Sequence, residues 1–228
     1  MSKSRSSLKR PEYPLAGIAL SAAGTFALLT ARVAHNQHFF KDYRRQRKIP
    51  TLTGHGKTVA HLIGYAGKDV GVLPLGGAVA SGLWKTGNRT GATAVMGAVT
   101  ASIVLAHLFD RVLPHRSPPP GRREPLNPSF PSGHSLRTSA LILTSSYILA
   151  RESKLDSRVI GGSALGLAAL TGIDRILLDR HWTTDVIAGW LGGIALAATA
   201  SAGYEMKRKS THKPRKRAPR RKPRKSSS

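Results

Sequence analysis

Two short clusters in this sequence bring together residue types that can transfer a phosphoryl group. The segment 131–134 reads Pro-Ser-Gly-His, and further along Arg175, His181 and Asp185 follow the spacing Arg-x5-His-x3-Asp. His181 and Asp185 share one face of a helix, so the carboxylate can accept the N–H of one ring nitrogen. The other ring nitrogen is then free to attack phosphorus. The clusters therefore predict phosphoryl transfer with a histidine nucleophile.

The side chains beside these histidines fit the remaining needs of such a reaction. Arg175 offers a planar fork that matches phosphate oxygens and stabilises charge developing in the transition state. Ser132 can cap the following helix, and Gly133 lets backbone N–H groups approach an anion at the start of that helix. His134 is placed to protonate the leaving oxygen as general acid. The clusters contain no group of carboxylates suited to magnesium, so no metal is expected.

Composition separates an apolar body from a basic tail. The chain has 228 residues, no cysteine and a formal net charge of +25. The lack of cysteine excludes disulfides, thiolate metal sites and a cysteine nucleophile. From Lys207 to Lys225 the chain has no acidic residue and three prolines. Because such a segment cannot bury apolar area to offset its ordering entropy, we expect it to be disordered.

Six apolar segments predict an all-α, polytopic membrane protein with a six-helix transmembrane bundle. They cover residues 15–31, 70–84, 91–109, 139–150, 159–173 and 186–204. Their Gly, Ala and Ser content suits close helix packing in a bilayer. A soluble bundle is the alternative, but it would show polar residues at helical period through each segment. The expected domains are a basic N-terminus (1–14), a membrane domain (15–206) and a disordered polybasic tail (207–228).

The distribution of Lys and Arg predicts that both termini are cytoplasmic, which requires an even number of spans. The loops 85–89 and 151–158 then also lie inside, whereas the basic segments 32–57 and 111–123 lie outside. Both histidine clusters fall on the outer, periplasmic or extracellular, face of the cell membrane. The basic residues 3–10 also allow a cleaved signal peptide, but the first apolar stretch is long for one, which favours a retained anchor.

In these motifs the chain resembles the type-2 phosphatidic acid phosphatase family, which is related to vanadium haloperoxidases. The family motifs are Lys-x6-Arg-Pro, Pro-Ser-Gly-His and Ser-Arg-x5-His-x3-Asp. The second matches fully, and the third matches with Asp174 in place of serine. The resemblance covers about residues 58–204. It implies six helices and no metal or other cofactor. It also implies that His181 forms a phosphohistidine, and that His134 gives a proton to the leaving group and later takes one from water.

The first family motif is degraded. One register places Arg111 at the lysine position, with Pro118 where arginine is expected and Arg116 two residues earlier as a substitute. A second register uses Arg116 and Arg123 but ends Arg-Glu-Pro. The phosphate-binding residues implied by the resemblance are Arg175, Arg111, Ser132, Gly133 and Arg116.

The resemblance implies a lipid phosphate or a prenyl diphosphate as substrate, because the family's membrane members act on such molecules. The basic tail is expected to bind anionic headgroups, at ~1 kcal/mol per Lys or Arg close to the surface. Nucleic acid is the alternative partner, although the tail has no aromatic residue for stacking on bases. A further alternative is a membrane scaffold whose phosphatase site is weakened or inactive. The sequence makes no prediction of the oligomeric state.

Overall fold

The computed structural model describes residues 11–35, 52–113, 116–119 and 129–212, and predictions about other residues lie outside this part of the chain. The described residues form seven α-helices and no strand, so the all-α class is confirmed. The helices are α1 (Glu12–His35), α3 (Gly54–Ala66), α4 (Asp69–Lys85), α5 (Arg89–Val112), α6 (Gly133–Glu152), α7 (Ser157–Leu177) and α8 (Thr183–His212). Each predicted apolar segment falls inside one of them.

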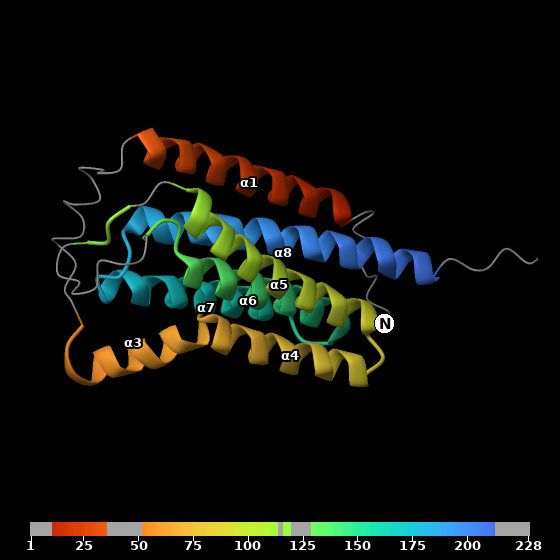
Figure 1. Cartoon of the computed structure of the whole chain (residues 1–228). Coiled ribbons are helices and arrows are strands. Elements are labelled where there is room, and N and C mark those ends of the chain that lie inside the picture. The colour runs from red at the N-terminus through yellow and green to blue at the C-terminus, as the bar shows by residue number, and fades with distance from the viewer. Residues whose placement is uncertain (1–10, 36–51, 114–115, 120–128, 213–228) are drawn as a thin grey trace, which may run out of the picture.

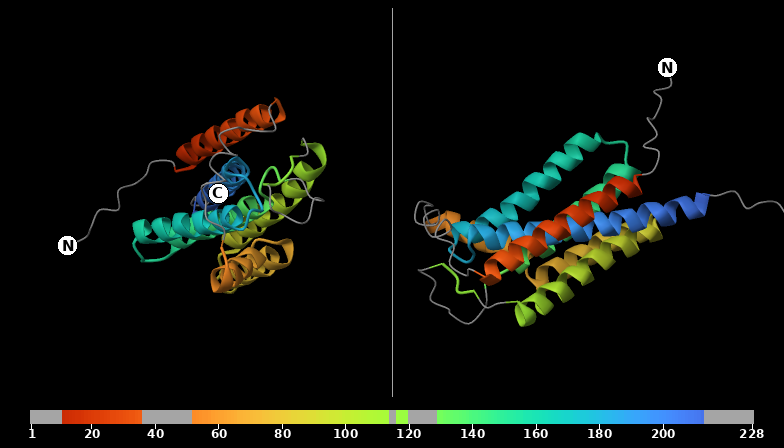
Figure 2. Two further views of the ribbon diagram at one scale, coloured as in Figure 1. Left: turned by 90° about the vertical axis from the view of Figure 1, so that its left-hand side faces the viewer. Right: turned by 90° about the horizontal axis from the view of Figure 1, so that it is seen from above.

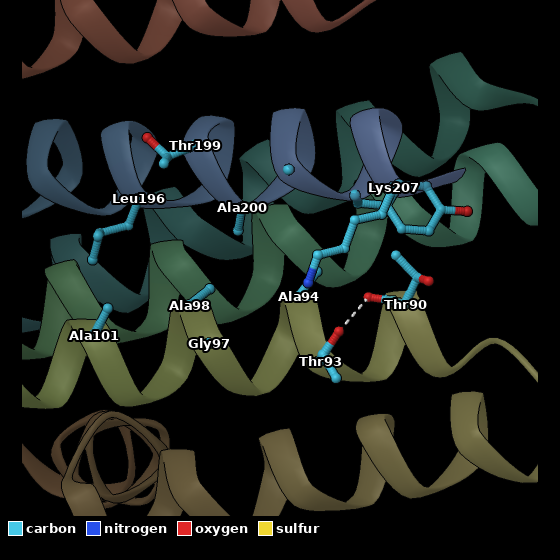
Figure 3. A pocket seen from close by; sticks show the side chains of 12 residues that line it. Thr90, Thr93, Ala94, Gly97, Ala98, Ala101, Leu196, Thr199, Ala200 and Lys207 are labelled. Carbon is cyan, nitrogen blue, oxygen red and sulfur yellow. Dashed lines mark hydrogen bonds between the residues drawn. The ribbon is translucent and has the colours of Figure 1, made fainter. Parts of the chain in front are cut away.

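Helix α8 lies at the centre of the bundle (Figure 1). It packs against α1, α5, α6 and α7. Helices α3 and α4 follow one another with a bend between them on the side of the bundle away from α1 (Figures 1 and 2), where α4 packs against α5 and α3 packs against α7. The ends of α5 and α7 and the beginnings of α6 and α8 lie together at one end of the bundle. We call this the motif end, because both histidine clusters are there.

Four of the described helices are long and apolar enough to cross a membrane: α1, α5, α7 and the part 183–209 of α8. Their outer surfaces carry large apolar side chains, such as Leu20 and Leu28 in α1, which are 75% and 74% exposed. Large exposed apolar surfaces are rare on soluble monomers, so these helices support a membrane protein. The predicted count of six spans stays a prediction, because α4 has only 17 residues and α6, with 20, is not among these four helices.

Close contact between α6 and α8 depends on two glycines of α8. A Cβ on Gly189 would lie 2.5 Å from the carbonyl oxygen of Ser132, and one on Gly193 would lie 2.5 Å from Ser139 Cβ. Small residues four apart let two helix backbones approach in this way. The contact holds the start of α6, which carries His134, against α8 just after the turn that carries His181.

At the end of the bundle away from the motifs, a buried carboxylate joins α8 to α6. Glu205 of α8 is 1% exposed and accepts hydrogen bonds from Arg151 Nε at 2.6 Å and from the Tyr147 hydroxyl at 3.0 Å, both in α6. The Tyr204 hydroxyl bonds to Glu152, also in α6. Helices α6 and α8 are therefore joined at this end as well as by their glycine contact.

Helix α8 runs six residues further than the predicted end of the membrane domain at Met206. Residues 207–212, expected to be disordered, are thus helical. Lys and Arg are good helix formers, and Lys209 gains a partner in Glu12 of α1 at 2.6 Å. The rest of the predicted tail, 213–228, lies outside the described residues.

Candidate active site

His181 lies in the turn between α7 and α8 with one ring nitrogen fixed by the backbone. Its Nδ1 is 2.7 Å from the carbonyl oxygen of Ser129. A carbonyl oxygen can only accept, so in the neutral ring Nδ1 carries the hydrogen and Nε2 holds the lone pair. His181 is therefore held in the tautomer that attack by Nε2 requires.

Asp185 holds the start of α8, and its carboxylate does not make the expected hydrogen bond to His181. It is fully buried, and its oxygens accept from the backbone N–H of Trp182 at 2.9 Å and from Arg116 Nη1 at 2.6 Å. Asp185 Oδ2 is 3.8 Å from His181 Nδ1, which is close enough for charge attraction but too long for a hydrogen bond. The Ser129 carbonyl takes the orienting role, and Asp185 acts on His181 through its charge.

Arg116 ties the segment before α6 to the start of α8. The side chain is 2% exposed, and Nη1 also donates to Thr184 Oγ1 at 2.6 Å. Its guanidinium lies over the Trp182 ring, 5.2 Å from the centroid. The Arg116 carbonyl accepts the N–H of Ser129 at 2.9 Å. Arg116 thus positions both groups that face His181 Nδ1, the Ser129 carbonyl and the Asp185 carboxylate.

The Pro-Ser-Gly-His turn begins α6 and is bonded directly to the second cluster. Ser132 is the N-cap of α6, and its hydroxyl accepts from the N–H of Ser135 at 3.4 Å. The N–H of Ser132 donates to the backbone carbonyl of Asp185 at 2.9 Å. Gly133 is the first residue of the helix, where backbone N–H groups have no partner within the helix. The two motifs therefore form one structural unit around the N-terminus of α6, a position where backbone N–H groups are able to bind an anion.

His134 lies in the first turn of α6, ahead of the apolar stretch 139–150. Its Nε2 is buried and has no hydrogen-bond partner among the described residues. Burial, followed by the positive charge of Arg175, holds the pKa of His134 well below its ordinary value. A phosphate bound here would oppose that shift with its negative charge and would supply the missing partner.

Arg175 is buried at the end of α7 and is paired with its own neighbour. Nε and Nη2 donate to the two oxygens of Asp174 at 2.9 and 2.6 Å, and Nη2 also donates to the Ala60 carbonyl at 3.0 Å. Asp174 stands where the family motif has serine, so its carboxylate occupies much of the fork that was assigned to phosphate. Helix α3 closes over the guanidinium at Gly64, which has no side chain.

Of the remaining candidates of the first family motif, the structure describes only Arg111. Arg111 is exposed in the last turn of α5, and Arg123 lies outside the described residues. Sequence reasoning missed Ser129, the Ala60 carbonyl and the buried Arg137, which neighbours Gly133. Within the described ranges no three His, Asp or Glu side chains gather in a way that could hold a metal ion.

Comparison with known proteins identifies the family of this chain. Residues 90–209 match the family model of the PAP2 superfamily. The chain belongs to the PAP2 superfamily. The resemblance to this family of membrane lipid phosphatases, inferred from the motifs, is thereby confirmed. Membership supports a phosphatase, and comparison with curated proteins gives no match.

Among solved structures, this PAP2 protein is similar to the first transmembrane PAP2-type phosphatidylglycerolphosphate phosphatase from Bacillus subtilis. The TM-score is 0.71 at 21% sequence identity, over 86% of this chain and 97% of the other. The two proteins therefore share a fold. The family match spans α5 to α8, whereas α3, which contributes Ala60 and Gly64 to the surroundings of Arg175, lies outside it.

Proposed function

We propose that this PAP2 protein is an integral membrane phosphohydrolase that removes phosphate from a lipid phosphate or a prenyl diphosphate through a phosphohistidine intermediate. The pair of imidazoles at the motif end carries the proposal. His181 has Nδ1 fixed by a carbonyl oxygen, and His134 has a buried Nε2 without a partner among the described residues. One ring is thus prepared to attack, and the other is prepared to exchange a proton.

In the first step, Nε2 of His181 attacks phosphorus and forms a P–N bond while the P–O bond to the leaving group breaks. The negative charge of the bound phosphate raises the pKa of His134, which takes up a proton as the substrate binds and then donates it to the leaving oxygen. His181 becomes positively charged, and Asp185, 3.8 Å from Nδ1, stabilises that charge. Arg175 holds phosphate oxygens with the part of its fork that Asp174 leaves open.

In the second step, the now neutral His134 takes a proton from water. The water oxygen forms a P–O bond while the P–N bond breaks, and inorganic phosphate leaves. Both histidines return to their starting states. The two histidines, the attacking water and the charged side chains account for every proton and charge in this scheme, which includes no metal ion.

The substrate and the placement in the membrane are part of the same proposal. Apolar helices surround the motif end, which favours a substrate with a lipid tail over a soluble phosphate ester. The charge distribution supports six crossings, with α3 and α4 together as one crossing, the site on the outer face of the cell membrane and both termini inside. The basic tail would then meet anionic headgroups of the inner leaflet.

The test is phosphate release by purified full-length protein from a panel of lipid phosphates and prenyl diphosphates in the presence of EDTA. We expect release from at least one member of the panel, inhibition by vanadate, and loss of activity in His181→Ala. Vanadate resembles five-coordinate phosphorus, so insensitivity to it would argue against a histidine nucleophile. No release from any substrate, where a control phosphatase responds, would contradict the proposed function.

A further inference from the structure

Arg137 is a buried cation that belongs to none of the three family motifs. It lies one turn after Gly133 in α6 and is 8% exposed. It is the only Lys, Arg, Asp or Glu between Glu124 and Arg151. Burial of a guanidinium is costly unless partners satisfy it, so the surroundings of Arg137 indicate what it does.

The guanidinium of Arg137 points back to the beginning of its own helix. A Cβ added to Gly133 would lie 3.1 Å from Arg137 Nη1 and 3.5 Å from Cζ. Long side chains on helices usually lean toward the N-terminus in this way. Positive charge is therefore added where the backbone N–H groups and the helix dipole already favour an anion.

Asp69, in the first turn of α4, holds Arg137 in this orientation. Arg137 Nε is 2.7 Å from Asp69 Oδ1, and the other oxygen of Asp69 is 2.7 Å from His107 Nε2. The first contact is close in distance but lacks hydrogen-bond geometry, so both of its atoms are buried without a proper bond. Nη1 reaches the Gly67 carbonyl only at 3.5 Å. The guanidinium is thus positioned by Asp69 and keeps donor capacity for another acceptor.

The other arginines near the site already donate to acceptors within the protein. Arg175 forms a bidentate pair with Asp174, and Arg116 Nη1 donates to Asp185 and Thr184. Among the described residues, Arg137 is the buried cation whose guanidinium lies at Gly133, at the start of α6.

We infer that Arg137 binds a phosphate oxygen of the substrate at the N-terminus of α6, in place of the cation that the degraded first motif lacks. The inference rests on the proposed function, since the anion is the phosphate that His181 attacks. Asp69 is a positioning residue that sets the direction of the guanidinium. The site would recognise the phosphate group itself, whichever lipid or prenyl chain carries it.

The experiment measures orthovanadate binding to purified full-length protein by titration calorimetry, beside phosphate release. Arg137→Gln should weaken vanadate binding at least about tenfold, because a charge-assisted contact is lost. The vanadate affinity of Arg137→Lys should lie between those of the wild type and Arg137→Gln, because lysine keeps the positive charge but not the planar fork of arginine. Arg158→Gln is the control, because Arg158 is an exposed arginine at the start of α7, away from the motif end.

Thermal unfolding of each variant distinguishes loss of vanadate binding from loss of the fold. If Arg137→Gln does not fold, the binding measurement is made with Arg137→Lys instead. The inference is overturned if a folded variant binds vanadate as the wild type does, or if the wild type binds none. Phosphate release that is unaffected by Arg137→Gln refutes the inference and leaves the proposed function intact. Binding that depends on Arg137, without release from any substrate, refutes the proposed function alone.

Discussion

Gly64 in α3 is the position where one methyl group should disturb the site most. A Cβ there would lie 1.7 Å from Arg175 Nη2 and 2.4 Å from Cζ, far below the 3.0 Å that real Cβ atoms keep. The guanidinium cannot simply swing away, because it is bonded to Asp174 and to the Ala60 carbonyl. In Gly64→Ala, therefore, either the buried ion pair breaks or α3 moves off the site.

The first outcome would lower the free energy of unfolding, and the second would lower the phosphatase rate. Breaking a buried ion pair costs about 3–5 kcal/mol, and alanine in a helix returns only about 0.5–1 kcal/mol relative to glycine. We therefore expect Gly64→Ala to lower the free energy of unfolding by about 2–4 kcal/mol if the pair breaks. If α3 shifts instead, stability changes little, but Arg175 is misplaced, and the phosphatase rate should fall about 100-fold.

The assay compares denaturant unfolding and phosphate release for Gly64→Ala and a matched control. Gly77→Ala in α4 places the same methyl group where it meets nothing within 4 Å. The control should keep the wild-type rate and equal or slightly exceed the wild-type stability. A Gly64→Ala protein with both wild-type stability and wild-type rate would refute the packing of α3 on Arg175.

Two further substitutions test the packing and the charge of the site. Asp174→Ser removes the carboxylate that occupies the fork of Arg175, so vanadate should inhibit at lower concentration while thermal stability falls; an unchanged inhibition constant would contradict this. Gly193→Ala should destabilise the protein by about 1–3 kcal/mol through overpacking of α6 on α8, whereas Gly162→Ala, with nothing within 4 Å of its Cβ, should not. Equal unfolding midpoints for these two glycine variants would refute the close α6–α8 contact.

The helices were predictable because their apolar segments are long and uninterrupted, but their ends were not. The segment 159–173 was predicted for what is α7 (Ser157–Leu177), which continues through two charged residues, Asp174 and Arg175. A hydropathy pattern ends where charge begins, whereas this helix continues because the two charges neutralise each other inside the protein. For the same reason α8 extended past the predicted start of the tail, with Lys209 paired to Glu12.

The candidate site was predictable where side chains carry the chemistry, and not where the backbone does. The motifs identified His134 and His181, yet nothing in the sequence assigns the carbonyl oxygen of Ser129 to His181. Every residue has such an oxygen, and only the fold selects one. Arg137 did leave a signal, since it is an isolated charge beside a Ser-Gly turn, but its direction depends on Asp69, which is 68 positions earlier in the sequence.

Chemical trapping of the intermediate tests most directly whether His181 carries the phosphoryl group. Purified protein is mixed with a radiolabelled lipid phosphate that it hydrolyses, quenched within the first turnover in alkali and, in parallel, in acid. We predict a protein-bound label that survives alkali, is lost in acid as a phosphohistidine should be, and is absent from His181→Ala. Label that is stable in acid, or that persists in His181→Ala, would contradict the account.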